Sequence, residues 1–153
     1  MALQHPQVLM PPPALYLGGL LMGYGLDQAL NPPPIAFPGQ PWLALLLLIF
    51  GVLLVVTAVW QLRHGHTTIM PHRAASTLIT KGAFALSRNP IYLGFTLLYL
   101  ALVLQQASLG MLAMLFPVLW VIHGHVIAAE ESFHAQQFGS QWQDYCARVR
   151  RWL

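Results

Sequence analysis

Residues 87–104 read "SRNPIYLGFTLLYLALVL" and join a short polar group directly to a long apolar run. Asn89 is a favoured residue just before a helix, and Pro90 is favoured at the first helical position. No charged residue follows until well beyond Leu104. The stretch therefore predicts a helix that begins at Pro90 in polar surroundings and continues into apolar ones.

The composition of the whole chain explains those apolar surroundings. Its 153 residues are 57% hydrophobic and only 7% charged, whereas soluble domains carry about 25% charged residues. A soluble core of this size cannot cover so much apolar surface, so the bilayer is the natural solvent. The single Cys146 excludes an internal disulfide, and a net charge of +3 gives no reason to expect nucleic-acid binding. We expect one integral membrane domain over residues 1–153.

Four apolar segments are long enough to propose as membrane helices, at residues 14–30, 42–62, 90–105 and 109–128. The first is rich in glycine, which suits close helix packing in lipid and offers a surface for another copy of the chain. Pro117 predicts a kink in the fourth. The short "QQAS" connection, residues 105–108, predicts a tight antiparallel hairpin between the last two. The fold class is therefore all-α, a bundle of four transmembrane helices.

The basic residues predict the orientation of this bundle. All seven Lys and Arg residues lie either between the second and third segments or after the fourth. The positive-inside rule then places both termini and the 63–89 loop in the cytoplasm. From Glu130 onward, aromatic residues interleave with polar and basic ones, so we expect a C-terminal amphipathic helix at the cytoplasmic membrane surface.

The polar residues at this cytoplasmic side include Arg88, Glu130 and Glu131. The start of a helix attracts anions, and Arg88 adds a bidentate donor for carboxylate or phosphate. The two glutamates are half of the acids in the chain, and a carboxylate at a helix C-terminus opposes the helix dipole. One interpretation is structural: a snorkelling arginine, and carboxylates paired with Arg88 or with later arginines. The functional interpretation is an anion site at Arg88 facing a cation site at Glu130, which would suit a zwitterion such as the amino-acid end of a cofactor.

Histidines add a second group of candidates, because "HGH" occurs at residues 64–66 and again at 123–125. Two histidines spaced i,i+2 on a helix do not share a face, and no HExxH or CxxC motif is present, so no metal site is expected. His123, His125 and Tyr92 are instead candidates to orient a substrate or to move a proton. GxGxxG, P-loop and GxSxG motifs are also missing.

Two longer stretches carry a family resemblance: "GHTTIMPHRAASTLITKGAFALSRNPIYLG", residues 65–94, and "EESFHAQQFGSQWQDYCARVRRW", residues 130–152. Together they resemble the integral-membrane methyltransferases related to isoprenylcysteine carboxyl methyltransferase and the bacterial phospholipid methyltransferases. The matching motifs occur in the family's order. The family-like catalytic region covers about residues 63–152, more than half of the chain.

The resemblance implies S-adenosylmethionine as cofactor, bound from the cytoplasm, and a lipophilic acceptor entering from the bilayer. It further implies an integral protein of a prokaryotic inner membrane. Arg88 matches the motif arginine and would hold the donor together with Glu130, while His123 or His125 would orient the acceptor. Carried over by position, the cofactor-binding residues are Ser76, Thr77, Leu78, Ile79, Phe84, Asn89, Pro90, Ile91, Tyr92 and Glu130.

Two other functions remain open on the sequence alone. Membrane reductases of the sterol-reductase type share a similar C-terminal helical region and use NADPH. A membrane adaptor with a degenerate site would need no activity at all. The sequence also does not name the acceptor: a phospholipid amine, a quinone-like or terpenoid group, a small thiol and a carboxylate all remain candidates.

Overall fold

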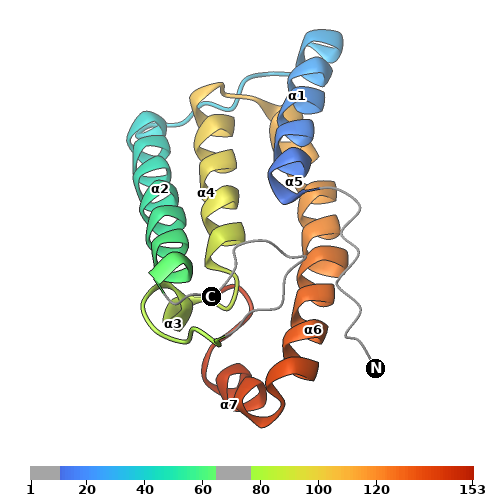
Figure 1. Ribbon diagram of the computed structural model, residues 1–153. Helices are drawn as coiled ribbons and strands as arrows, with labels where there is room; N and C mark the ends of the chain where they lie inside the picture. The colour runs from blue at the N-terminus through green and yellow to red at the C-terminus, as the bar shows by residue number, and fades with distance from the viewer. Residues whose placement is uncertain (1–10, 65–76) are drawn as a thin grey trace.

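A computed structural model of the protein describes residues 11–64 and 77–153, and this described part consists of helices without any strand (Figure 1). Four long helices form the bundle, and a π-helical turn with three shorter helices completes it. The elements in chain order are α1 (Pro12–Leu30), α2 (Gln40–His64), α3 (Ala83–Leu86), α4 (Pro90–Gln105), α5 (Leu109–Val121), η1 (Ile122–Ile127), α6 (Ala128–Phe138) and α7 (Ser140–Arg148). The all-α prediction is confirmed for these residues, and α4 begins at Pro90 as expected.

The bundle is built from two close helix pairs. α4 packs mainly along α2, and α5 packs mainly along α1. The turn between α4 and α5 is short, as "QQAS" predicts, and the Ser108 hydroxyl oxygen caps α5 by accepting the N–H of Met111 at 2.9 Å. The two helices of the expected hairpin thus have their most extensive contacts with other helices.

Glycines allow both pairs to approach closely. A Cβ atom at Gly94 of α4 would lie 2.5 Å from Cγ2 of Val55 in α2, and one at Gly23 of α1 would lie 2.4 Å from Cα of Met111 in α5. Gly18 and Gly25, by contrast, have nothing within 4 Å of such an atom. Part of the glycine-rich first segment therefore serves packing inside the chain, while packing against another copy stays a prediction.

Among the described residues, two helices are long and apolar enough to cross a membrane: Gln40–His64 and the continuous helix Leu109–Phe138. Pro90–Gln105 is also apolar but shorter. α2 buries only a small-residue stripe of Ala44, Gly51 and Ala58, while its large aliphatic side chains are mostly exposed, which suits a lipid environment. The fourth predicted segment continues past residue 128 through η1 and α6. The count of four crossings stays a prediction.

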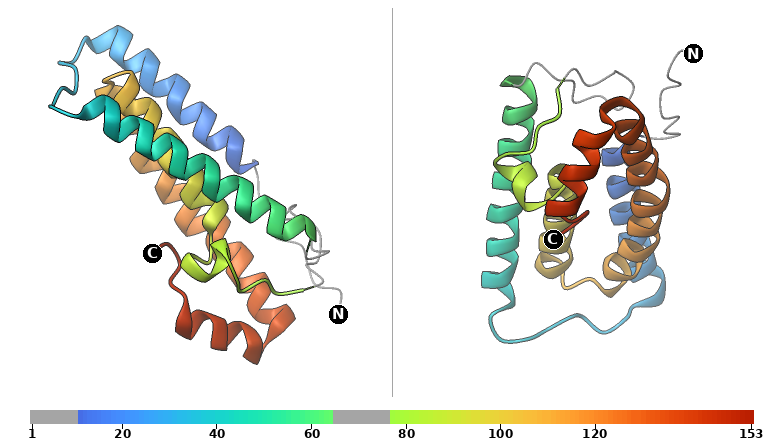
Figure 2. Two further views of the ribbon diagram at one scale, coloured as in Figure 1. Left: turned by 90° about the vertical axis from the view of Figure 1, so that its left-hand side faces the viewer. Right: turned by 90° about the horizontal axis from the view of Figure 1, so that it is seen from below.

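The single C-terminal amphipathic helix expected from Glu130 onward is divided in the structure. Gly139 adopts φ +52° and separates α6 from α7, so the chain turns back. α7 then lies across the lower end of the bundle, meaning the end where α2 finishes and α4 begins (Figure 2). Its aromatic residues Trp142 and Tyr145 are buried within the protein, so they are not available for the contact with the membrane surface that we expected of them.

Candidate functional site

The loop that leads into α4 is fixed from two sides. The side-chain oxygen of Gln61 in α2 accepts the N–H of Ala83 at 3.1 Å, and Gly82 adopts φ +63° beside the Gln61 side chain. On the other side, the Tyr145 hydroxyl of α7 donates to the carbonyl of Phe84 at 2.6 Å. Burial raises the pKa of Tyr145, so this hydroxyl remains a proton donor at neutral pH.

The segment after α7 lies along the residues that precede α4. The backbone N–H of Arg88 donates to the carbonyl of Arg150 at 3.0 Å. The side chains of Ser87 and Asn89 both donate to the carbonyl of Arg151, at 3.2 and 3.1 Å. Asn89 occupies the N-cap position of α4 as predicted, but its side chain makes no capping hydrogen bond and holds this segment instead.

Charged side chains from three parts of the chain meet beside these backbone contacts. Glu131 of α6 pairs with Arg88, with 3.0 Å between Oε1 and Nη2, and its other oxygen binds Arg151. Arg151 Nη1 lies 3.1 Å from Nε2 of His123, and the indole N–H of Trp152 points to Nδ1 of the same ring at 3.0 Å. We call Arg88, His123, Glu131, Arg151 and Trp152 the charged cluster.

Tyr92 and Glu130 form a second, more buried contact next to this cluster. The Tyr92 hydroxyl donates to Oε1 of Glu130 at 2.6 Å. Both ion pairs found among residues 11–64 and 77–153 involve Glu131, so in that part of the chain Glu130 has a neutral hydroxyl as partner and no cation. The Tyr16 hydroxyl of α1 donates to the carbonyl of Tyr92 at 3.1 Å and thereby ties α1 to the first turn of α4.

The structure gathers some of the predicted site residues and leaves others apart. Arg88, Tyr92, His123 and Glu130 all take part in the contacts just described. His125 is exposed and lies edge-on to Trp120, with ring centroids 5.4 Å apart.

The remaining predicted cofactor residues lie on the loop and at the start of α4. Thr77 is exposed, whereas Leu78, Ile79, Phe84 and Ile91 are half-buried and Asn89 and Pro90 are buried. Ser76 lies outside the described residues. Sequence reasoning missed Tyr16, Tyr145, Arg151 and Trp152 as contributors. The last three fall within residues 130–152, which carry the family motif, and their polar side-chain groups could have marked them as site residues. Tyr16 stands in an apolar segment without any motif.

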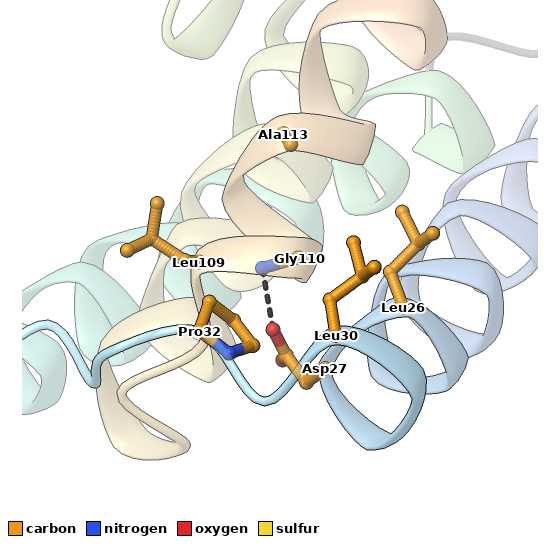
Figure 3. A pocket seen from close by; sticks show the side chains of 7 residues that line it. All are labelled: Leu26, Asp27, Leu30, Pro32, Leu109, Gly110 and Ala113. Carbon is orange, nitrogen blue, oxygen red and sulfur yellow. Dashed lines mark hydrogen bonds between the residues drawn. The ribbon is translucent and has the colours of Figure 1, made fainter.

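The opposite, upper end of the bundle holds a shallow apolar hollow (Figure 3). Its one charged group is Asp27, whose Oδ1 accepts the N–H of Gly110 at 2.7 Å and whose Oδ2 binds the Ser108 hydroxyl. These contacts tie α1 to the start of α5. The hollow is lined by Leu26, Asp27, Leu30, Pro32, Leu109, Gly110 and Ala113.

The fold and the cluster together define a small helical membrane protein in which Asp27 lies at the upper end and the charged cluster at the lower end. Residues 40–141, two thirds of the chain, match the family model described as phospholipid methyltransferase, and the chain belongs to that family. It is therefore a member of a methyltransferase family, and its apolar helices fit a membrane setting. No curated protein and no solved structure matches the chain.

Proposed function

We propose that the protein transfers a methyl group from S-adenosylmethionine to a lipophilic acceptor at the cytoplasmic face of a membrane. The observation that carries this proposal is Glu130, a carboxylate inside the family-matched region that has no cation partner among the described residues. A poorly solvated carboxylate of this kind favours a cationic ligand group. Arg88 is paired with the neighbouring Glu131 and offers the positive charge that an anionic ligand group needs.

The residues present fit the methionine end of this cofactor. Two guanidinium groups share Glu131, and Glu130 supplies the balancing negative charge, so the site as a whole is near neutral. A zwitterion preserves that balance, with its ammonium group on Glu130 and its carboxylate on Arg88. Phe84 and residues 77–79 and 89–92 are proposed to hold the remainder of the cofactor.

Positioning is the main contribution of the protein to such a reaction. When bound, S-adenosylmethionine supplies an electrophilic methyl group on a positively charged sulfur. Tyr92 fixes the direction of Glu130 through its 2.6 Å hydrogen bond. His123, at the exposed edge of the site, is proposed to orient the polar head of the acceptor, and the proton that the acceptor loses is proposed to pass to solvent there.

The acceptor is proposed to be a lipid that enters sideways, so that only its polar head reaches the charged cluster. The exposed aliphatic side chains of α2 support a lipid-facing bundle.

We propose four crossings, with the basic lower end and both ends of the sequence in the cytoplasm. An Ala36→Cys variant, placed in the opposite loop, should then react with an impermeant thiol reagent only from outside. Labelling only from the cytoplasm would show that the orientation is the reverse of the one proposed.

Binding and turnover in detergent micelles test the function itself. Calorimetry should show binding of S-adenosylmethionine and none of NADPH, and labelled methyl should appear in extracted lipid. Two acceptors with the same polar head, one long-chained and one short-chained, then test the lipid route, and kcat/KM should be higher for the long-chained one. Binding of NADPH in place of S-adenosylmethionine would replace the proposal with a reductase.

A further inference from the structure

Arg151 stands ten residues beyond the family-matched range, yet it contacts both halves of the charged cluster. We propose that Arg151 is a positioning residue: through Glu131 it sets the direction of Arg88, and together with Trp152 it holds the ring of His123. The inference rests on the proposed methyl transfer, because it assigns the donor side to Arg88 and the acceptor side to His123.

The first step concerns Glu131, whose two oxygens are divided between two guanidinium groups. Oε1 faces Arg88 and Oε2 faces Arg151. A carboxylate left with one arginine prefers a bidentate pair, in which two parallel N–H groups are used. By occupying Oε2, Arg151 prevents that pairing and leaves donors of Arg88 for an anionic ligand group. Loss of Arg151 would let Glu131 compete with the ligand for Arg88.

His123 has two ring nitrogens that both face groups that only donate. Arg151 Nη1 is 3.1 Å from Nε2, and the Trp152 indole nitrogen is 3.0 Å from Nδ1. A neutral imidazole has one accepting nitrogen, so each tautomer is held by one of the two donors. The rings of His123 and Trp152 are also nearly parallel, with 10° between their planes. The ring direction is therefore fixed from both sides, which suits a residue that orients the polar head of the acceptor.

Backbone contacts hold the segment that carries Arg151 together with the ion pair of its side chain. The carbonyls of Arg150 and Arg151 accept three hydrogen bonds from residues 87–89. Ser87, one of the donors, is fully buried. Arg151 is thus held by its backbone and, through its guanidinium group, by its side-chain partners. Its position is therefore defined before a ligand arrives.

Substitutions of Arg151 and Trp152 separate the effect on donor binding, through Arg88, from the effect on turnover, through His123. Arg151→Ala should weaken S-adenosylmethionine binding about tenfold and also lower kcat for the long-chain acceptor. Arg151→Lys keeps a cation for Glu131 but lacks the planar fork that reaches His123 as well, so it should recover donor affinity and leave kcat low. Trp152→Phe retains an aromatic ring without the indole N–H and should lower kcat alone.

Arg148→Ala is the matched control, because Arg148 is an exposed arginine at the end of α7 whose Nε donates to the nearby carbonyl of Asp144. It should behave like the parent in both measurements. If Arg151→Ala matches Arg148→Ala in donor affinity and kcat, the inference is wrong. It is equally wrong if Arg151→Lys restores both quantities together, because one charge would then explain everything.

Amide hydrogen exchange gives a readout that does not depend on activity. The N–H of Arg88 is bonded to the carbonyl of Arg150, and the ion pair between Arg151 and Glu131 holds the same C-terminal segment against α6. Loss of that ion pair should loosen the segment, so a peptide covering residues 86–90 should exchange faster in Arg151→Ala than in Arg148→Ala. A parent that binds no S-adenosylmethionine would refute the proposed function, and faster exchange would still support the holding contact. Unchanged exchange in Arg151→Ala would overturn the inference even in an active methyltransferase.

Discussion

Asp27 and Glu131 are both acids that join separate helical regions. Asp27 lies in the last turn of α1 and Glu131 in the first turn of α6, and these parts of the two helices lie at opposite ends of the bundle (Figure 1). Asp27 binds a backbone N–H and a hydroxyl group at the start of α5. Glu131 binds two guanidinium groups, from the loop before α4 and from the segment after α7. Each acid has both of its oxygens engaged, but the partners of Asp27 are neutral and those of Glu131 are charged.

This difference separates a structural contact from a contact suited to ligand binding. The N–H groups at a helix start favour a carboxylate, so Asp27 is in a locally favourable place and needs no further partner. At the lower end, two arginines and two glutamates lie close together, and one of the glutamates has only a hydroxyl as partner in the described chain. Substitutions at the upper end should therefore change stability, and those at the lower end should change binding.

The largest expected effect is on the packing that brings Asp27 to α5. A Cβ at Gly23 would lie 2.4 Å from the Met111 backbone, whereas one at Gly25 would meet nothing within 4 Å. Gly23→Val should therefore lower the free energy of unfolding by about 3 kcal/mol, as overpacking does, and Gly25→Val should leave it nearly unchanged. Thermal unfolding in detergent measures both. Equal melting temperatures would show that α1 does not pack on α5 in this way.

Glu130→Gln carries the next largest expected effect, and it should change donor binding without changing stability. The change removes the negative charge that the cofactor's ammonium group needs but keeps an acceptor for Tyr92. Donor affinity should fall ten- to hundred-fold, the effect of losing a charge-assisted hydrogen bond, and Arg88→Ala should weaken donor binding similarly. Calorimetry provides the affinity and thermal unfolding the stability. Parent-like binding by both variants would contradict the zwitterion site.

Asp27→Ala is the reciprocal experiment at the upper end. It leaves the Gly110 N–H and the Ser108 hydroxyl without their acceptor, so stability should fall by about 1.5 kcal/mol. Donor affinity should be unchanged, because the charged cluster lies at the other end of the bundle. A loss of donor affinity without a loss of stability would erase the distinction between the two ends.

The sequence alone predicted the long helices well, because prolines and apolar runs mark them. α4 begins at Pro90 as predicted, and α1 and α2 begin and end within a few residues of the expected bounds. Polar groups at the lower end were also predicted to gather, since the basic residues and Glu130 had to lie on one side of the bundle.

The choice of partners could not be predicted in the same way. The π-helical η1 widens the helix before Glu130 and Glu131 and so changes which face each residue occupies relative to a regular α-helix. Arg88 consequently pairs with Glu131 rather than facing Glu130 directly. Asp27 and Tyr16 make contacts with residues about 80 positions away, and no local pattern announces such pairs.

Tyr145→Phe carries the smallest expected effect and tests how firmly the lower end is held. The Tyr145 hydroxyl is bonded to the Phe84 carbonyl at 2.6 Å, so its removal should cost about 1 kcal/mol of stability and weaken donor binding a few-fold. Tyr24→Phe, at an exposed tyrosine of α1, is the control and should change neither.

Burial raises the pKa of Tyr145, which means that the protonated form is the one stabilised by folding. Its contribution is therefore present below pH of about 10, the ordinary pKa of tyrosine, and is lost as the pH rises through the higher pKa of the folded protein. The stability difference between parent and Tyr145→Phe should thus stay constant from pH 6 to about 9, and a difference that shrinks within that range would mean that another group holds Phe84.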